Sequence, residues 1–231
     1  MSLPILSAGA AKGLVAAVAQ PFTAETGVDV TGEFGAVGAM RDRLAAGAPC
    51  DVIILTAAMI AALENEGVVA AGTVAPLGRV RTGIAVRAGT TLPDIADGAG
   101  LARALTAAVG ILFPDPQRAT AGIHFVDVLR RLEIYEAVAD RLRPYPNGAT
   151  AMRELATAPE EGLIGCTQIT EIRYTPGVTL VGPLPPGFEL ATVYSVAVCA
   201  QAADPARARA FARRLAGPEN RVLRHEGGFE D

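Results

Sequence analysis

Short apolar runs alternate with longer amphipathic stretches along the first third of the chain. The apolar runs have the length and composition of buried strands, and the stretches between them carry apolar residues at helical spacing. A glycine follows each stretch, where a helix commonly ends. In order, the predicted elements are strand Ile5–Ser7, helix Ala11–Thr26, strand Val28–Phe34, helix Val37–Ala46, strand Val52–Thr56 and helix Ala57–Asn65. This order predicts a parallel sheet covered on both faces.

Two further apolar strands, Gly83–Arg87 and Val193–Ala200, interrupt this rhythm and enclose a second alternating region. Within it the pattern predicts helices at Leu92–Asp97, Leu101–Val109, Gly122–Leu132, Ile134–Leu142 and Thr150–Ala158, and strands at Gly110–Phe113, Leu163–Cys166 and Val178–Val181. A last helix is expected at Pro205–Leu215. The simplest architecture is two Rossmann-like α/β lobes joined by two crossover strands. Lobe I would hold residues 1–82 and 196–231, and lobe II residues 83–195.

Composition narrows the function classes. The chain has 231 residues, 51% of them hydrophobic, which is ample for a large buried core. Its net charge of −4 and its lack of a basic run argue against nucleic acid as a partner. No apolar stretch approaches the roughly 18 residues of a membrane span. Three widely spaced cysteines and two histidines form no metal-ligand pattern, so we expect neither a metal nor another cofactor.

The start of the chain bears on where the protein works. The first predicted strand follows Met1 closely, without the charged segment and apolar core of an export signal. We expect a cytoplasmic protein if the chain is native as given, and a periplasmic one if an export signal was removed. In the second case a membrane permease would be its partner. In both cases a monomer is expected.

One cation stands apart from the others. Of the 20 lysines and arginines, only Lys12 is a lysine. It follows a strand and a run of small residues, Ser7–Ala11, that would let a ligand approach the backbone. The helix that begins there offers unpaired N–H groups and the positive end of its dipole. Lys12 therefore predicts an anion site, and the alternative is an ordinary surface lysine.

Two sequence frames connect the chain to a known family. The first comprises Phe22, Thr26–Val30, Phe34 and Gly47–Val52, and the second Asp115-Pro116, Ala121-Gly122 and Gly162–Gly165. In these frames the chain resembles the molybdate-type solute-binding proteins, the family that also includes aconitate isomerase. The resemblance covers nearly the whole chain. It implies a type II periplasmic-binding-protein fold, in which two lobes close on a ligand held in a cleft between them.

The chain departs from the family pattern at the ligand. The family holds its oxyanion with a serine after the first strand and another after the second. Ala10 stands at the first of these positions, and the second falls within Ala36–Gly38. The family's tyrosine after a later strand falls on Gly165. A small tetrahedral oxyanion needs a tight ring of neutral donors, so these three departures argue against molybdate.

Other residues around the same loops favour a larger anion. In this fold the loops at the carboxyl ends of the strands face the ligand. A lysine, hydroxyls and amides near helix N-termini suit an organic carboxylate. The candidate ligand-binding residues are Ser7, Ala10, Lys12, Gly35, Val37, Thr56, Thr120, Asn147, Thr167 and Gln168. Thr167 could instead cap the next helix, and Asn147 could hold a turn with Gly148.

Three functions fit these residues. The first is a solute-binding protein that captures a small organic anion without chemistry. The second, which is the main alternative, is a cofactor-free isomerase of an unsaturated organic acid, with Lys12 and Cys166 as catalytic residues. Glu171 could act as a base or lie on a solvated helix face. The third is a cytoplasmic ligand sensor or storage protein. No acid–base pair stands out from the sequence, which favours the binding protein.

Overall fold

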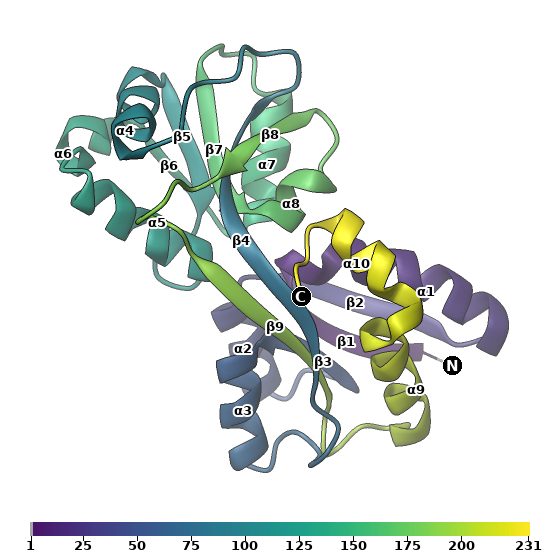
Figure 1. The fold of residues 1–231 in the computed structure, drawn as a ribbon. Helices are drawn as coiled ribbons and strands as arrows, with labels where there is room; N and C mark the ends of the chain where they lie inside the picture. The colour runs from purple at the N-terminus through teal and green to yellow at the C-terminus, as the bar shows by residue number, and fades with distance from the viewer. Residues whose placement is uncertain (1) are drawn as a thin grey trace. The chain divides into compact units, whose positions relative to one another are not determined.

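The computed structural model describes residues 2–231. The chain divides into two compact units (Figure 1). Unit 1 comprises Met1–Val80 and Thr192–Asp231, and unit 2 comprises Arg81–Ala191. Strand β4 (Ala75–Arg87) runs from unit 1 into unit 2, and β9 (Ala191–Val198) returns the chain to unit 1. Unit 2 is thus an insertion between the two segments that form unit 1.

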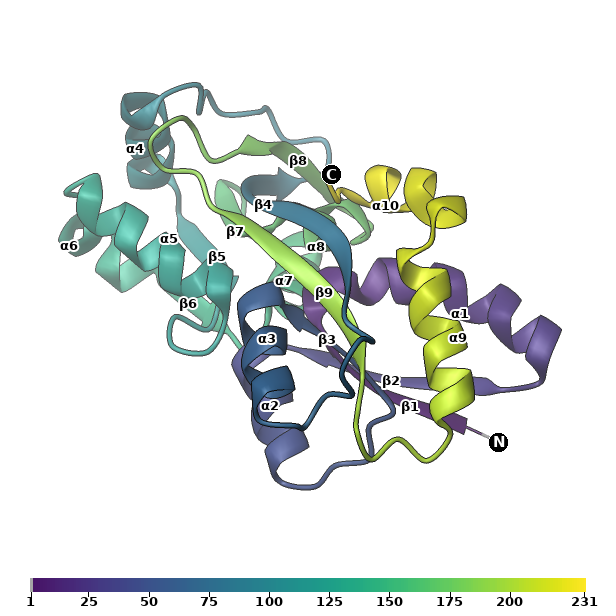
Figure 2. The ribbon, with the colours of Figure 1, turned by 60° about the horizontal axis from the view of Figure 1, so that its bottom comes forward.

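The sheet of unit 1 has the strand order β2-β1-β3-β9-β4. Strand β1 lies parallel to β2 and β3, and β9 runs antiparallel to β3. Helices α1, α9 and α10 lie on one face of this sheet, and α2 and α3 lie on the other (Figures 1 and 2). The bounds are β1 Ser2–Ala8, α1 Lys12–Thr26, β2 Asp29–Gly35, α2 Val37–Ala45, β3 Val52–Thr56, α3 Ala57–Asn65, α9 Pro205–Ala216 and α10 Arg221–Gly227.

The core of unit 1 explains why its strands are almost continuously apolar. Residues 52–55 of β3 are all fully buried, as expected for a central strand with helices on both faces. The rings of Phe22 on α1 and Phe211 on α9 pack edge-on with centroids 5.1 Å apart. Helix α1 ends at Gly27, whose φ of 68° places it in the left-handed region that glycine tolerates. The first and last segments of the chain therefore share one core.

The sheet of unit 2 has the order β4-β7-β5-β6, and β8 pairs with β4. Strand β5 lies parallel to β6 and β7, whereas β4 runs antiparallel to β7 and β8. The bounds are α4 Gly98–Ala107, β5 Gly110–Pro114, α5 Thr120–Arg131, α6 Tyr135–Val138, β6 Leu142–Tyr145, α7 Gly148–Thr157, β7 Leu163–Gln168, α8 Ile169–Arg173 and β8 Val178–Pro183.

Successive side chains of the central strand β5 belong in turn to two different hydrophobic clusters of unit 2. Phe113 belongs to the cluster that contains Phe125 of α5, and their ring centroids are 5.4 Å apart. Its neighbour Leu112 belongs to the cluster that contains Met152 and Leu155 of α7. Since successive strand side chains point to opposite faces, the two clusters cover opposite faces of this sheet. Unit 2 is therefore a three-layer α/β arrangement, as its pattern predicted.

Most predicted helices and strands are present, but Leu92–Asp97 is not a helix. Pro93 follows directly on Leu92, which disfavours the helical conformation at the residue before it. The Asp94 carboxylate accepts the backbone N–H of Ala96, and the Asp97 carboxylate accepts that of Gly100. These bonds form a turn and then the N-cap of α4, so the segment leads into a helix instead of forming one.

The helical prediction for Ile134–Leu142 holds as far as Arg141 and fails at Leu142, and strand β6, which begins there, was not predicted. Helix α6 is followed by a 3-10 turn (Ala139–Arg141), and β6 begins at Leu142. Strand β6 is an edge strand, at the end of the strand order and next to β5. It contains Pro144, which edge strands tolerate, and the amphipathic pattern in front of it masked its extended conformation. The short helices α8 and α10 were also not predicted.

Strand β7 is longer than predicted, which changes the setting of two candidate residues. It extends from Leu163 to Gln168, so that Thr167 and Gln168 are strand residues and not loop residues. Both are buried. Their polar groups must therefore be satisfied inside the protein or by a bound molecule.

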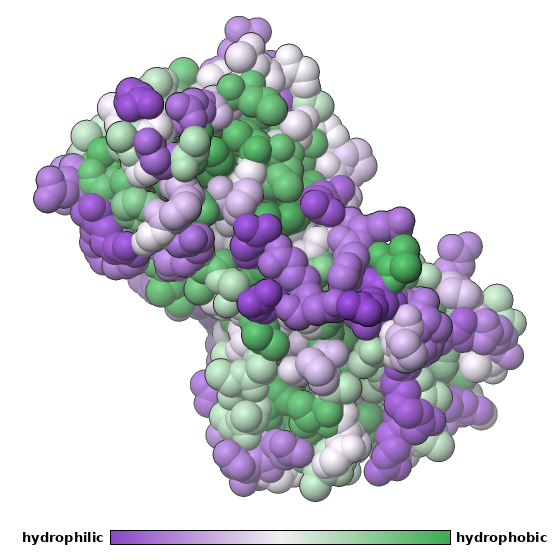
Figure 3. All heavy atoms as spheres, viewed as in Figure 1, coloured by the Kyte–Doolittle hydropathy of each residue, from purple (hydrophilic) through white to green (hydrophobic). Residues whose placement is uncertain are grey.

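Most charged residues lie on the surface of the protein. On the face shown in Figure 3, hydrophilic residues gather over α9 and α10, and Arg209 and Arg213 of α9 are exposed. Among residues 2–231, no helix is both long and apolar enough to cross a membrane.

Candidate functional site

The carboxyl ends of β1, β2 and β3 lie at one edge of the unit 1 sheet, because these strands are parallel. Each end leads directly into a helix, and a 3-10 turn (η1, Gly9–Ala11) connects β1 to α1. The last residues of β1 and β2, Ala8 and Gly35, lie opposite each other. This edge brings together the candidate residues of unit 1, which are Ser7, Ala10, Lys12, Gly35, Val37 and Thr56.

Helices α1 and α2 begin at this edge with alanine at the N-cap. An alanine side chain cannot accept the first N–H groups of a helix, so Ala11 and Ala36 leave those donors uncapped by their own side chains. The N-terminal N–H groups carry the positive end of the helix dipole. Ala10 is buried in the turn before α1, and Val37 is the buried first residue of α2. The backbone N–H of Lys12 donates to the Gly9 carbonyl within the 3-10 turn, so α1 continues from that turn. No side chain caps the start of α2, which presents backbone N–H groups at this edge.

Lys12 is the first residue of α1 and its side chain is exposed. Its ammonium nitrogen lies 6.0 Å from the ring centroid of Phe34, which is the second-last residue of β2. A cation over an aromatic face at this distance is weakly attracted. The contact directs the ammonium from the start of α1 toward the end of β2. The single lysine therefore adds positive charge to the edge where α1 and α2 begin.

The two hydroxyls at this edge already have partners within the protein. Ser7 is fully buried, and its hydroxyl donates to the backbone carbonyl of Ala8 at 2.9 Å. Thr56 is the N-cap of α3, where its hydroxyl accepts the backbone N–H of Met59. A Cβ on Gly35 would lie 2.8 Å from Cε of Met40, so glycine lets α2 pack closely against the end of β2. Ser7 and Gly35 thus have structural roles whether or not a ligand binds.

Unit 2 has a corresponding edge at the carboxyl ends of β5, β6 and β7. Asp115 follows β5, and its carboxylate accepts the backbone N–H groups of Gln117 and Arg118 in a tight turn. This turn and the end of β6 line an open hollow of about 450 Å³ that contains Gln117 and Tyr145. The unit 2 candidates lie along the same three strand ends, and they are Thr120, Asn147, Thr167 and Gln168.

A buried carboxylate lies beside this edge. Oε2 of Glu171, on α8, accepts a hydrogen bond of 2.5 Å from the Thr167 hydroxyl. The backbone N–H groups of Ala149 and Gln168 also donate to Glu171. Burial raises the pKa of Glu171 to about 7, although all three hydrogen bonds act in the opposite direction. Glu171 therefore holds its proton in a range where an exposed glutamate has lost it.

The expectation that Glu171 might lie on a solvated helix face was wrong. Helix α8 was missed in the sequence because it is only five residues long, and four of those residues, including Glu171, are buried. Gly148, the first residue of α7, makes room for the carboxylate. A Cβ at Gly148 would lie 2.0 Å from both Glu171 Oε2 and Thr167 Oγ1. The feature that locates this site is the contact of Gly148 with Thr167 and Glu171, which are four residues apart. This contact forms only in the tertiary fold, so the sequence alone does not show it.

The remaining candidates of unit 2 differ in what their side chains do. Asn147 caps α7, since its side-chain oxygen accepts the backbone N–H of Thr150 at 2.9 Å. Thr120 is the half-buried first residue of α5. Gln168 is buried, and it interacts with other groups of the protein. Cys166 is fully buried in a hydrophobic cluster, and burial raises the pKa of its thiol. A protonated, enclosed thiol is a poor nucleophile.

The fold and these strand-end edges define the class of protein. The chain has an α/β fold with helices on both faces of mixed sheets, of the periplasmic-binding-protein type, and the predicted fold class is confirmed. The family model described as "Bacterial extracellular solute-binding protein" matches residues 3–230. The chain belongs to that family.

Individual relatives agree with this assignment. An aconitate isomerase from a Pseudomonas species is 28% identical over 240 residues, covering 99% of this chain and 87% of that protein. The molybdate-binding protein ModA of Escherichia coli K12 is 27% identical over 230 residues, covering 92% and 82%. The periplasmic molybdate-binding protein of Azotobacter vinelandii superposes with a TM-score of 0.81 at 20% identity, covering 99% of each chain. The predicted resemblance to molybdate-type solute-binding proteins is confirmed.

Proposed function

We propose that the chain is a solute-binding protein that captures a small organic anion with one or more carboxylates, and not molybdate. The observation that carries the proposal is the edge of unit 1, where the ammonium of Lys12 adds a positive charge and where no side chain caps the starts of α1 and α2. Helix N-termini and a lysine attract anions through backbone donors and a point charge. The chain belongs to a solute-binding family, which supports the proposal that this positive charge serves to capture an anion.

The choice of a carboxylate over molybdate follows from the donors. Ala10 and Val37 occupy the region where the family pattern has serines, and they offer no side-chain donor. Ser7, which precedes Ala10 by three residues in the sequence, donates instead to the Ala8 carbonyl. A neutral ring of hydroxyl donors is therefore replaced by backbone N–H groups and a full positive charge. That donor set lacks the tetrahedral ring of hydroxyls that a small oxyanion needs, and a charged donor beside backbone N–H groups suits the flat two-oxygen group of a carboxylate.

The proposal also assigns ligand contacts to unit 2. Thr120 and Asn147 stand at helix starts, and Thr167 and Gln168 lie at the end of β7. Closure of the two units around the anion would complete its hydrogen bonds, as in hinge-closing binding proteins. If the protein is exported, a membrane permease would receive the ligand. We propose a monomer in either compartment.

A second candidate function is supported by two observations. One is the similarity to an aconitate isomerase over 99% of this chain. The other is Glu171, whose pKa of about 7 suits a group that takes up and returns a proton near neutral pH. In a cofactor-free isomerase of an unsaturated acid, a base removes a proton from carbon, the double bond moves, and the proton returns to the carbon at its other end. Lys12 would stabilise the negative charge that develops on the carboxylate in between.

A ligand screen tests the proposal. Thermal shift and calorimetry against molybdate, sulfate, and di- and tricarboxylates should give a response to carboxylates and a weaker one, or none, to the inorganic ions. Tight molybdate binding with no response to carboxylates would overturn it. Proton-exchange NMR of each bound acid in deuterated water then separates the two functions. Deuterium entering the ligand carbon shows isomerase chemistry, and binding without exchange shows capture.

A further inference from the structure

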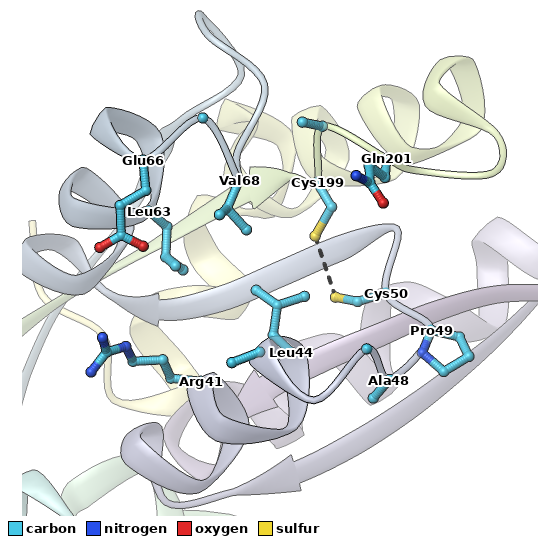
Figure 4. Close-up of a pocket in the computed structure, with 14 residues that line it drawn as sticks. Arg41, Leu44, Ala48, Pro49, Cys50, Leu63, Glu66, Val68, Cys199 and Gln201 are labelled. Carbon is cyan, nitrogen blue, oxygen red and sulfur yellow. Dashed lines mark hydrogen bonds between the residues drawn. The ribbon is translucent and has the colours of Figure 1, made fainter.

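Two buried thiols meet at the end of unit 1 opposite to the candidate site. Cys50 lies just before β3, and Cys199 lies just after β9. Their sulfur atoms are 3.5 Å apart (Figure 4). Val52 pairs with Val198 across the antiparallel ladder, and the backbone N–H of Cys199 donates to the Asp51 carbonyl at 2.9 Å. The ladder therefore holds the backbones of the two cysteines next to each other.

We propose that Cys50 and Cys199 are a reversible redox pair that a small disulfide compound oxidises to an internal disulfide. A disulfide bond is about 2.05 Å long, so the two sulfurs must approach by about 1.5 Å. Side-chain rotation can supply a movement of this size. The backbone on the Cys199 side is held further by the N–H of Ala200, which donates to the carbonyl of Val68 at 2.9 Å.

A cavity gives the oxidant a route to the pair. It has a volume of about 620 Å³, and both cysteines line it. Leu44, Leu63 and Val68 give it an apolar wall, and polar side chains join them at Arg41, Glu66 and Gln201 (Figure 4). Cavities of roughly 300 to 1,000 Å³ accept small organic molecules. A small disulfide with charged ends therefore fits both the size and the mixed polarity of this cavity.

The two thiols differ in acidity, which sets the order of the reaction. The Cys199 contact and burial both raise the pKa of Cys50, whereas the contact with Cys50 lowers the pKa of Cys199. Cys50 also donates to the carbonyl of Val52 at 3.2 Å. Cys199 is thus the better thiolate and Cys50 is the resolving thiol.

The exchange balances without any further reactant. The Cys199 thiolate attacks one sulfur of the small disulfide, forms a mixed disulfide and releases one small thiolate. The Cys50 sulfur then attacks Cys199 Sγ and releases the second. The two protein thiols lose their protons to the two released thiolates. The two electrons lost by the protein reduce the sulfur–sulfur bond of the oxidant.

The bond would connect positions 149 residues apart and enclose the whole of unit 2 in its loop. Closing so long a loop lowers the conformational entropy of the unfolded chain, so oxidation should raise the melting temperature. Cys50 stands at the amino end of β3, and Thr56 stands at its carboxyl end. The cross-link is therefore remote from the candidate ligand edge and independent of the proposed function.

Thiol counting on the whole protein tests the pair. The chain has three cysteines. After equilibration with oxidised glutathione and unfolding in denaturant, we expect one titratable thiol where the reduced protein has three. Peptide mapping should join the Cys50 and Cys199 peptides. The matched control is Cys166→Ala, which should fall from two thiols to none and show the same rise in melting temperature on oxidation.

Two results would overturn the proposal. One is the persistence of three thiols at oxidant concentrations that oxidise a free dithiol. The other is a disulfide that includes Cys166. In the Cys50→Ala variant we expect a glutathione adduct on Cys199 and no rise in melting temperature. Should that variant fail to fold, the wild-type protein and Cys166→Ala still decide the question through their thiol counts and peptide maps.

Discussion

The Thr167 hydroxyl donates a 2.5 Å hydrogen bond to Oε2 of Glu171, and both side chains are buried in unit 2. Together with the N–H of Ala149 this bond places a carboxylate at the start of α7, where the helix dipole is positive. Desolvation nevertheless prevails over these favourable contacts, because it raises the pKa of Glu171 to about 7. Because Glu171 is ionisable and buried, the stability of the folded protein depends on pH.

We predict that Glu171 makes the protein less stable as the pH rises through the weakly acidic range. In the unfolded chain its pKa is near the ordinary 4.5, and in the folded protein it is about 7. Between these values the folded state keeps a proton that the unfolded state has lost. The stabilisation is therefore fully present below pH 4.5 and is lost as the pH approaches and passes 7. The difference corresponds to about 3 kcal/mol.

Urea unfolding of the wild type and Glu171→Gln at several pH values measures this effect. The glutamine variant cannot ionise, so its stability relative to the wild type should increase with pH. Glu154→Gln, which alters an exposed glutamate on α7, serves as the matched control and should follow the wild type. Parallel curves for the wild type and Glu171→Gln would show that Glu171 ionises freely in the folded state.

Gly148→Ala should destabilise the protein by about 1–3 kcal/mol, in the range of an overpacked core. The new methyl group would overlap Glu171 Oε2 and Thr167 Oγ1, and neither group can move into solvent because both are buried. Gly227→Ala in α10 is the control, since open space surrounds that position and alanine favours a helix. Equal denaturation midpoints for the two variants would contradict this description of the Glu171 site.

The sequence was sufficient for the elements whose pattern is local. Helix α1 was predicted from its apolar spacing and Gly27, and α3 and β3 were predicted to the residue. The short elements β6 and α8 were not, because four and five residues are too few to show a periodic pattern of their own.

The candidate site was predictable to a similar degree. Parallel strand order, which the sequence pattern predicts, places Lys12 and the loops after β1, β2 and β3 at one edge. The partner of each hydroxyl could not be deduced in the same way, as the bond from Ser7 to the Ala8 carbonyl shows. Nor could the approach of Cys50 and Cys199, which depends on two chain segments separated by the whole of unit 2.

Replacement of Asn147 can separate its two possible roles. Asn147→Ala removes the acceptor for the Thr150 N–H and should cost about 1 kcal/mol of stability. Asn147→Ser keeps a capping oxygen but loses the amide. We therefore expect Asn147→Ser to unfold nearly as the wild type does in urea. If its affinity for a carboxylate identified in the screen falls as well, the amide contacts the ligand. Unchanged affinity in a stable serine variant would assign Asn147 to helix capping alone.

Lys12→Gln should weaken binding of the identified carboxylate at least tenfold, which corresponds to about 1.4 kcal/mol. Its ammonium supplies the full positive charge at the edge where α1 and α2 begin. Glutamine has a neutral amide and a similar side-chain length, so the substitution removes mainly that charge. Because Lys12 is exposed, the stability of the protein should hardly change. Arg209→Gln removes one positive charge from an exposed position on α9 of the same unit, and calorimetry should find its affinity unchanged. An equal loss in both variants would point to net charge, and no loss in Lys12→Gln would place the anion elsewhere.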